Sequence, residues 1–216
     1  MDIMTLVKIL ASAGLSYVIG SIPTAYIFGK LMKGIDIRQH GSGNVGATNA
    51  FRVLGKGPGT AVLILDIIKG IIPVVFVAGF LDASVTGCII AAVAAVCGHN
   101  WTCFLSFKGG KGIATTLGVL IGLTVVIPQA RIAVLLCVGV WLAVFLLTRI
   151  VSISSLVAAV CLPVVMVLFN APTSMVILSI VFCVFIVIRH RPNVHRLLSG
   201  QEPRVPLPWM KVSKLP

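Results

Sequence analysis

The chain has 216 residues, of which 58% are hydrophobic and 10% are charged, and its mean hydropathy is +1.12. Soluble domains carry about 25% charged residues, so this composition excludes an ordinary water-soluble globule and predicts an integral membrane protein. The 17 Lys and Arg residues against five acidic ones give a net charge of +12. These cations lie between apolar runs and not on a separate domain, which argues against nucleic acid as a partner. Their placement is typical of cytoplasmic loops, and we expect only a minority of them to bind an anionic substrate.

Seven apolar segments follow along the chain, each close to the ~20 residues that a helix needs to cross a bilayer. The stretch 112–147 could be one long helix or two, but Pro128-Gln129-Ala130-Arg131 interrupts it with a proline, an amide and a charge, which favours two. We therefore predict an all-α polytopic protein with about seven transmembrane helices. The segments run over residues 5–29, 58–80, 84–101, 112–127, 131–147, 153–169 and 173–189.

The distribution of charge supports seven crossings. With seven, 14 of the 17 cations fall on one side, which the positive-inside rule makes cytoplasmic. This places the N-terminus outside and the C-terminus in the cytoplasm, whereas fusing the middle pair would send Arg149 and the basic tail to the opposite face. We expect a single domain over residues 1–216, with cytoplasmic polar segments at 33–56, 102–111 and 189–216.

The first polar segment, from Asp36 to Arg52, is rich in glycine and in hydrogen-bond donors. Its glycines can turn successive backbone N–H groups toward one point, which forms a nest for an anion, and its arginines can bind phosphate through two hydrogen bonds. A flexible linker between two helices would also contain glycine and serine, but it would not need so many donors together. We predict a phosphate-binding loop made by Gly41, Ser42, Gly43, Asn44, Gly46, Thr48, Asn49 and Arg52.

The second polar segment, Gly98–Gly112, carries two lysines around a Gly-Gly pair and is followed directly by a predicted helix. A helix N-terminus with exposed amides and nearby lysines is a ready anion site. The GxxxxGK[ST] spacing of a P-loop is missing. A basic loop placed by topology would explain the lysines but not the glycines, and His99 alone is typical of a hydrogen-bonded interfacial histidine. The predicted substrate-binding residues are Lys108, Gly109, Gly110, Lys111 and Gly112.

The third polar segment, Arg189–Arg204, ends the last apolar run. His190 and Asn193 are three residues apart and would share a helix face if the helix continued, although Pro192 disfavours continuity. A basic tail that binds anionic lipid explains the same residues equally well.

Two smaller features lie elsewhere. Asp66 and Lys69 stand at i, i+3 inside the second apolar segment, where we expect a structural ion pair. Ser152, beside Arg149 on the predicted cytoplasmic side, could lend a hydroxyl to a substrate. The six cysteines form no CxxC pair and lie mostly in apolar runs, so they indicate neither disulfides nor a metal site.

Taken in order, these segments resemble the acyl-phosphate:glycerol-3-phosphate acyltransferases of bacterial phospholipid synthesis, and the resemblance covers nearly the whole chain. One departure is Thr102, where the family commonly has a proline that shapes a loop. The matching stretches are GSIPTAYIFGK (20–30), DIRQHGSGNVGATNAFRVLGKG (36–57), LDIIKG (65–70), GHNW with FKGGKGIAT (98–115) and HRPNVHRLLSGQEPR (190–204).

The resemblance implies transfer of an acyl group from acyl phosphate to the 1-hydroxyl of glycerol 3-phosphate, which gives 1-acyl-glycerol 3-phosphate (lysophosphatidic acid) and phosphate. It implies this first step of phospholipid biosynthesis at the cytoplasmic face of the bacterial inner membrane, without cofactor or metal. It also implies that Ser42, Arg52, His190 and Asn193 are catalytic, that the second segment binds substrate, and that Glu202 supports structure.

The chemistry of this reaction agrees with the residues. Acyl phosphate is already activated, so the enzyme needs no covalent nucleophile, and no G-x-S-x-G elbow is present. Positioning and preorganised donors suffice. His190 could take the hydroxyl proton, or it could orient a substrate whose own phosphate takes it.

Three other functions fit parts of the pattern. A transporter or carrier of a phosphate ester could use the same anion-binding loops. A CDP-alcohol phosphotransferase would need a metal-binding DxxDG cluster, which the sequence lacks. A membrane scaffold would need none of the polar residues.

Overall fold

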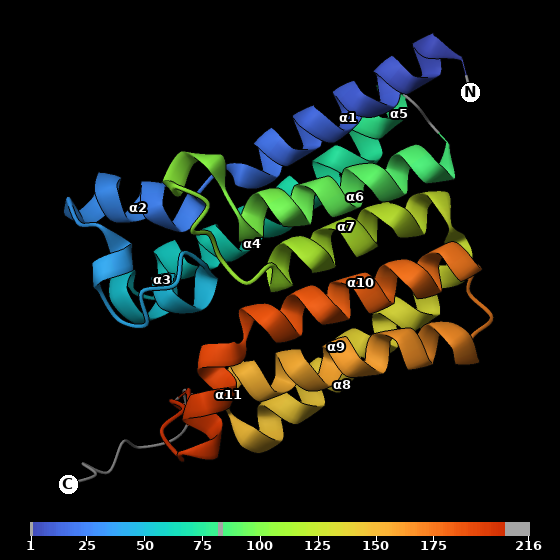
Figure 1. The fold of residues 1–216 in the computed structure, drawn as a ribbon. Coiled ribbons are helices and arrows are strands. Elements are labelled where there is room, and N and C mark those ends of the chain that lie inside the picture. The colour runs from blue at the N-terminus through green and yellow to red at the C-terminus, as the bar shows by residue number, and fades with distance from the viewer. Residues whose placement is uncertain (1, 82–83, 206–216) are drawn as a thin grey trace, which may run out of the picture. The chain divides into compact units, whose positions relative to one another are not determined.

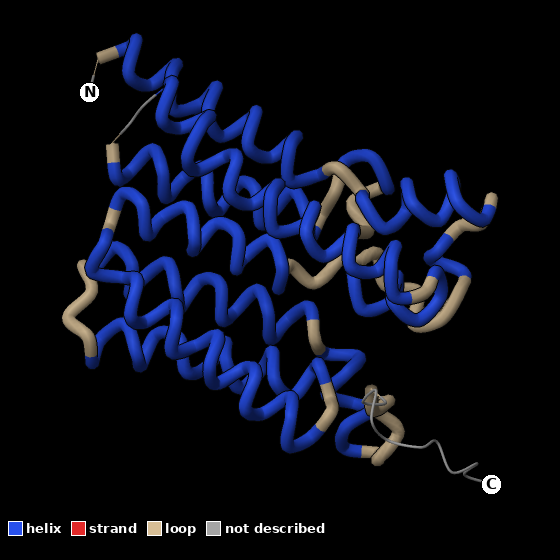
Figure 2. Tube along the Cα trace, turned by 180° about the vertical axis from the view of Figure 1, so that it is seen from behind, coloured by secondary structure: helices blue, strands red, loops and turns tan. Residues whose placement is uncertain are grey.

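The computed structural model describes residues 2–81 and 84–205, and every regular element within them is a helix (Figures 1 and 2). The prediction of an all-α protein is therefore confirmed for the described residues. The chain divides into two compact units, residues 1–131 and 132–216, which are described in turn. The prediction of a single domain remains a prediction.

The first unit contains the long helices α1, α4, α6 and α7, joined by short helices and polar loops (Figure 1). Helix α1 packs on α6, and α4 packs on α7. The elements are α1 (Ile3–Ser21), α2 (Thr24–Lys33), η1 (Ile37–Gln39), α3 (Ala47–Leu54), α4 (Lys56–Ile72), the π-helical turn η2 (Pro73–Val77), α5 (Ala78–Leu81), α6 (Val85–Asn100), η3 (Cys103–Leu105), α7 (Ile113–Val126) and η4 (Pro128–Ala130).

Glycines let these helix pairs approach until their backbones touch. A Cβ atom on Gly20 of α1 would lie 2.1 Å from the carbonyl oxygen of Ala95 in α6. A Cβ atom on Gly118 of α7 would lie 2.1 Å from the carbonyl oxygen of Ile67 in α4. Membrane helices associate through such small residues because lipid supplies no hydrophobic force between them. The contacts fix the helix ends that carry the polar loops.

The first apolar segment, predicted as one helix over 5–29, is two helices separated at Ile22-Pro23, and that prediction is wrong in this respect. Proline has no N–H to donate and disfavours a helical conformation of the residue before it. Carbonyls freed within a membrane need protein donors. The Thr102 hydroxyl donates to the Ser21 carbonyl (2.6 Å), and the Lys69 amine donates to the Ile22 carbonyl (2.7 Å).

Up to residue 205, the second unit is built from α8 (Arg131–Thr148), α9 (Val151–Leu168), α10 (Thr173–Arg189) and α11 (Arg191–Leu198), of which α9 packs on α10. Helices α10 and α11 meet at His190 with a bend of 59°. The chain after α11 returns to the α8–α9 junction, where the Val205 N–H donates to the Arg149 carbonyl (2.8 Å).

The helices match the predicted segments closely. Within the described residues, five stretches are long and apolar enough to cross a membrane, the bent pair α10–α11 can serve as a sixth, and α7 is a shorter apolar helix of 14 residues. The stretch 112–147 is two helices, as its proline indicated. The part of the tail over 206–216, with Lys211 and Lys214, lies outside the described residues.

Candidate functional site

The loop over residues 40–46, called here the first loop, is held closed by the buried amide of Asn49 in α3. The amide nitrogen donates to the carbonyls of Ile37 (3.2 Å) and His40 (3.0 Å), and its oxygen accepts the backbone N–H of Ser42 (2.9 Å). Gly41 has φ +62°, and a Cβ atom there would lie 2.3 Å from the Asn49 amide oxygen. Asn49 and Gly41 therefore shape the loop. The Ser42 N–H donates to Asn49 and so stabilises the loop.

Three side chains of this region stand at the surface with polar groups available to a ligand. The Ser42 and Thr48 hydroxyls and the Arg52 guanidinium belong to exposed residues, and none has a hydrogen-bond or ion-pair partner in residues 2–81 or 84–205. Asn44 is half-buried in the same loop. The N-terminus of α3 at Gly46 has no side-chain cap, so its first N–H groups add to the donors.

The other arginine of the first polar segment is occupied. Arg38 donates from Nε to Oδ1 (3.0 Å) and from Nη2 to Oδ2 (2.7 Å) of Asp36 and lies 5.3 Å from the centre of the Tyr26 ring. The hydrogen bonds from Arg38 lower the pKa of Asp36 to about 2. This pair anchors the start of the first loop and leaves Arg52 as the cation open to a substrate there.

The loop over residues 101–112, called the second loop, folds back on the end of α6. The Gly109 N–H donates to the Asn100 carbonyl (3.2 Å), and the Gly110 N–H donates to the His99 carbonyl (3.0 Å). A Cβ atom on Gly110 would lie 2.1 Å from Nε2 of His99. The paired glycines thus permit a close approach of backbone to side chain.

The second loop also presents cations and a helix start. Lys108 is exposed and has no partner among the described side chains and backbone groups, while Lys111 is half-buried. Gly112, with φ +79°, begins α7 without a side-chain cap. The helix predicted to follow this loop directly is confirmed at Ile113.

The two loops meet in the first unit (Figure 1). A Cβ atom on Gly110 would lie 2.9 Å from the carbonyl oxygen of Val45, so the backbones of the second and first loops are in contact. The open donors Ser42 and Lys108 therefore belong to two adjoining loops, and Arg52 belongs to α3, which directly follows the first loop. This arrangement is suited to phosphate groups.

In the second unit, the imidazole of His190 has a defined orientation. It is 2% exposed, and its Nδ1 lies 2.8 Å from the Ile186 carbonyl. A carbonyl can only accept, so Nδ1 donates, and the neutral ring then carries its lone pair on Nε2. This tautomer can accept a hydrogen bond from a hydroxyl group.

Glu202 gathers the remaining predicted residues of the second unit around its carboxylate. Its Oε1 accepts from Asn193 (2.5 Å) and Ser152 (2.7 Å), and its Oε2 accepts from Arg196 (2.7 Å). Burial raises the pKa of Glu202, but these three donors outweigh it and hold the pKa below the ordinary value. Ser152 and Asn193 thus lie together, because both donate a hydrogen bond to Glu202.

The predicted ion pair in α4 is confirmed, with 2.8 Å between the Lys69 amine and Asp66 Oδ1. The sequence interpretation missed two further members. The Thr24 hydroxyl donates to the same oxygen (2.6 Å), and His99 Nδ1 lies 3.8 Å from it. Both could have been noticed in the sequence as polar residues near the end of an apolar segment. Thr24 directly follows Pro23, and His99 lies just before the second loop.

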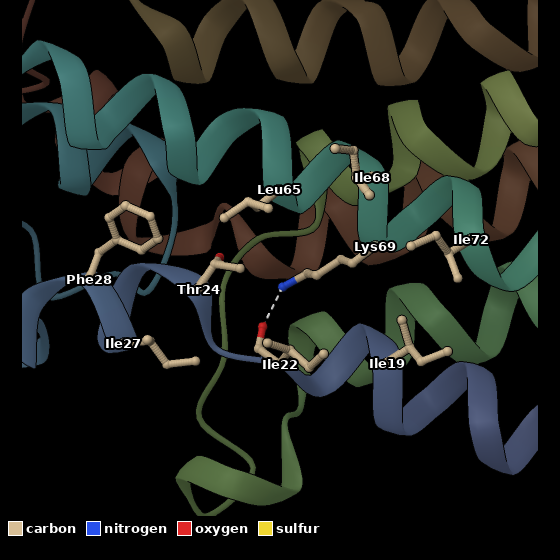
Figure 3. A pocket seen from close by; sticks show the side chains of 9 residues that line it. All are labelled: Ile19, Ile22, Thr24, Ile27, Phe28, Leu65, Ile68, Lys69 and Ile72. Carbon is tan, nitrogen blue, oxygen red and sulfur yellow. Dashed lines mark hydrogen bonds between the residues drawn. The ribbon is translucent and has the colours of Figure 1, made fainter. Parts of the chain in front are cut away.

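An apolar groove of about 260 Å³ lies between α1, α2 and α4, and Lys69 is among the side chains that line it (Figure 3). Its lining suits hydrocarbon. The lining residues are Ile19, Ile22, Thr24, Ile27, Phe28, Leu65, Ile68, Lys69 and Ile72. Within the described residues, no three His, Cys, Asp or Glu side chains gather as metal ligands would.

Comparison with known proteins gives a consistent result. Residues 10–200 match the family model described as glycerol-3-phosphate acyltransferase. The chain is 45% identical over 204 residues to a glycerol-3-phosphate acyltransferase of Synechococcus sp. (strain JA-2-3B'a(2-13)), covering 94% of this chain and 98% of that protein. It is 41% identical over 188 residues to one of Fusobacterium nucleatum subsp. nucleatum, covering 87% and 93%.

Two solved structures have a similar fold. Both are of PlsY (YgiH), an integral membrane glycerol 3-phosphate acyltransferase, one in a glycerol 3-phosphate form and one in a lysophosphatidic acid form. The first has a TM-score of 0.83 and 37% identity over 92% of this chain and 96% of that chain. The second has a TM-score of 0.79 and 36% identity over 94% and 95%.

Proposed function

This chain belongs to the glycerol-3-phosphate acyltransferase family, and on that premise we propose that it transfers an acyl group from acyl phosphate to the 1-hydroxyl of glycerol 3-phosphate. The products are 1-acyl-glycerol 3-phosphate and inorganic phosphate. The reaction is the first step of phospholipid biosynthesis in a bacterial inner membrane. Because the family is enzymatic, the alternative of a phosphate-ester transporter is not retained.

The observation that carries the proposal is the set of open donors on two adjoining loops and on α3. Ser42, Arg52 and Lys108 offer a hydroxyl and two cations without competing partners among the described residues. Acceptor and donor substrates each bring a phosphate, so a paired anion site is what the reaction requires. The related structures in glycerol 3-phosphate and lysophosphatidic acid forms support the acceptor and the product.

Within this site, the predicted residues divide into two groups. Gly41, Gly43 and Asn49 shape the first loop, and Gly109, Gly110 and Gly112 shape the second. Ser42, Asn44, Thr48, Arg52, Lys108 and Lys111, with the α3 N-terminus at Gly46, are the groups proposed to contact phosphate.

In the proposed reaction, the 1-hydroxyl of glycerol 3-phosphate attacks the carbonyl carbon of acyl phosphate. A C–O bond forms to the glycerol oxygen, and the bond from the carbonyl carbon to the phosphate oxygen breaks. The cations stabilise the negative charge that develops on the carbonyl oxygen and on the leaving phosphate. His190 accepts a hydrogen bond from the attacking hydroxyl at Nε2, and the proton passes to the released phosphate. Asn193 and Ser152, which donate to Glu202 in the second unit, are the other residues that we propose to take part.

We also propose seven crossings, with the N-terminus outside and the catalytic loops on the cytoplasmic face. The 14-residue helix α7 is about 21 Å long at 1.5 Å per residue, so it crosses a ~30 Å core only together with its flanking residues. The support is the charge distribution, because this count places 14 of the 17 cations on one side.

The test is an assay of the purified protein with glycerol 3-phosphate and one of three donors, namely acyl phosphate, acyl-CoA or the thioester of acyl carrier protein. Product should form only from acyl phosphate, because the site offers groups that bind the phosphate of this donor. Equal use of acyl-CoA would contradict the proposed donor.

A further inference from the structure

Three polar side chains, Thr24, Asp66 and Lys69, form a cluster inside the first unit that lies outside the two substrate loops. The side chains of Asp66 and Lys69 are 1% and 7% exposed, although both belong to an apolar helix able to cross a membrane. Ionised groups in such a place are costly and are retained where they serve a purpose.

The side chain of Lys69 points into the protein, where its amine contacts polar groups. A lysine in a membrane helix commonly extends its amine to the aqueous interface. Here the stem lies along the apolar groove, and the amine turns inward to the Ile22 carbonyl (2.7 Å), as Figure 3 shows, and to Asp66 Oδ1 (2.8 Å). The Ile22 carbonyl also accepts the Thr24 N–H (3.0 Å), so the lysine is its second donor.

The cluster faces the imidazole of His99. Asp66 Oδ1 accepts from Thr24 (2.6 Å) and Lys69, and lies 3.8 Å from Nδ1 of His99. An oxygen held by two donors is fixed in place, and an imidazole with a proton on the facing nitrogen is attracted to it in a region of low dielectric. The buried carboxylate thus lies beside one edge of the His99 ring.

The opposite edge of the ring rests on the second loop. Nε2 occupies the position next to Gly110, where a Cβ atom would approach it to 2.1 Å. Gly110 in turn touches the Val45 carbonyl of the first loop, with 2.9 Å from the same Cβ position. A chain of direct contacts therefore runs from the cluster through His99 to both phosphate-binding loops.

We propose that Asp66 is a positioning residue for acyl transfer, which acts through His99 to set the distance between Lys108 of the second loop and Arg52 of α3. Reactions that depend on placing two substrates lose rate when groups shift by about 1 Å. The inference rests on the proposed function, because it assigns Asp66 a role in that same site. Asp66 itself need not touch substrate.

The test uses the neutral pair Asp66→Asn/Lys69→Met, which removes both charges and leaves no unpaired ion in the interior. Its kcat, its KM for each substrate and its thermal midpoint are measured in detergent beside Leu123→Ala, a cavity variant near the far end of α7. We expect the neutral pair to raise KM for glycerol 3-phosphate about tenfold or more, whereas Leu123→Ala lowers the midpoint and leaves KM unchanged.

A second comparison shows whether the effect passes through His99. In a His99→Gln background, which already releases the second loop, adding the neutral pair should change KM by less than twofold. Full additivity of the two effects, or a wild-type KM in the neutral pair, overturns the proposal. If the neutral pair does not fold, Thr24→Val, which removes one donor to Asp66 while keeping the side-chain shape, should raise KM in the same direction.

A readout without turnover separates this inference from the proposed function. Glycerol 3-phosphate should raise the thermal midpoint of the wild-type protein and should raise that of the neutral pair much less. If the wild-type protein does not use acyl phosphate, the proposed donor is rejected. The rise in thermal midpoint with glycerol 3-phosphate, compared between the wild type and the neutral pair, still decides the role of Asp66. An equal shift in both proteins overturns the inference.

Discussion

At the scale of single residues, the sequence identified the polar positions but could not divide their roles. Asn49 and Arg52 stand three residues apart in one helix, and both are plausible phosphate ligands by residue type. The structure distinguishes their roles. The Asn49 amide forms hydrogen bonds with three backbone groups, whereas the Arg52 side chain has no partner among the described residues. A glycine that permits close packing, such as Gly110, looks the same in sequence as one that forms an anion nest.

Arg52→Ala should lower kcat/KM by about 100-fold, as loss of one charged donor to a developing anion does elsewhere. Its thermal midpoint should stay unchanged, because the guanidinium has no protein partner in the described residues. Lys56→Ala, which removes an exposed cation just beyond α3, is the matched control and should retain wild-type activity. Equal losses in both variants would show that net charge, and not the position of Arg52, matters.

Asn49→Ala should behave in the opposite way and lower stability first. It removes one of the two hydrogen bonds that each of the Ile37 and His40 carbonyls accepts, and it leaves the N–H of Ser42 without its partner. A buried polar group left without a hydrogen bond costs about 1–3 kcal/mol. The thermal midpoint and the proteolysis of the first loop measure this. A variant with wild-type stability and reduced substrate affinity would instead make Asn49 a direct ligand.

Glu202 gives a prediction for pH. Its folded pKa is below the ordinary value, so it contributes stability above the unfolded carboxyl pKa of about 4.3 and loses that contribution as pH falls through the folded value. Glu202→Gln should therefore be less stable than the wild type at pH 7, with the difference shrinking in acid. A difference independent of pH would contradict a carboxylate that holds Ser152, Asn193 and Arg196.

At the scale of helices, apolar run lengths predicted most of the fold. Pro128 correctly marked the separation of α7 from α8, but the equally visible Pro23 was passed over in the first apolar segment. The reason is physical: a break inside a membrane is tolerated only where tertiary donors reach the freed carbonyls. Lys69 and Thr102 supply those donors from segments 47 and 81 residues away, and local sequence does not display such contacts.

Helix packing through glycine is testable with a matched pair of alanine substitutions. Gly118→Ala in α7 would place a methyl group 2.1 Å from the Ile67 carbonyl and should lower the thermal midpoint by several degrees. Gly139→Ala in α8 meets nothing within 4 Å and should be neutral or slightly stabilising, since alanine favours helix by up to ~1 kcal/mol. A similar midpoint for the two variants would contradict backbone contact between α4 and α7.

At the scale of the whole molecule, the charge distribution determines the expected orientation in the membrane. The cations follow the ends of apolar helices, so their side can be predicted from the sequence once the number of crossings is chosen. That choice depends on α7, whose 14 residues are short for a span. The two compact units carry different motifs, and the sequence alone did not show this division.

Cys103 offers a direct test of orientation, because it is exposed in the second loop. A membrane-impermeant maleimide should label it in inverted membrane vesicles and not in intact cells whose outer envelope has been opened. Cys103→Ser provides the background from the other five cysteines. Labelling from the outer face would reverse the proposed topology and move both loops out of the cytoplasm.

The central claim is that two adjoining loops bring acyl phosphate and glycerol 3-phosphate together for direct transfer. The most direct measurement is the ratio of inorganic phosphate released to 1-acyl-glycerol 3-phosphate formed by the purified protein, with each substrate supplied alone and then both together. We predict a ratio of about one with both substrates and negligible phosphate release without glycerol 3-phosphate, because no covalent acyl-enzyme precedes the attack. Rapid phosphate release from acyl phosphate alone, or no lipid product with both, would contradict the account.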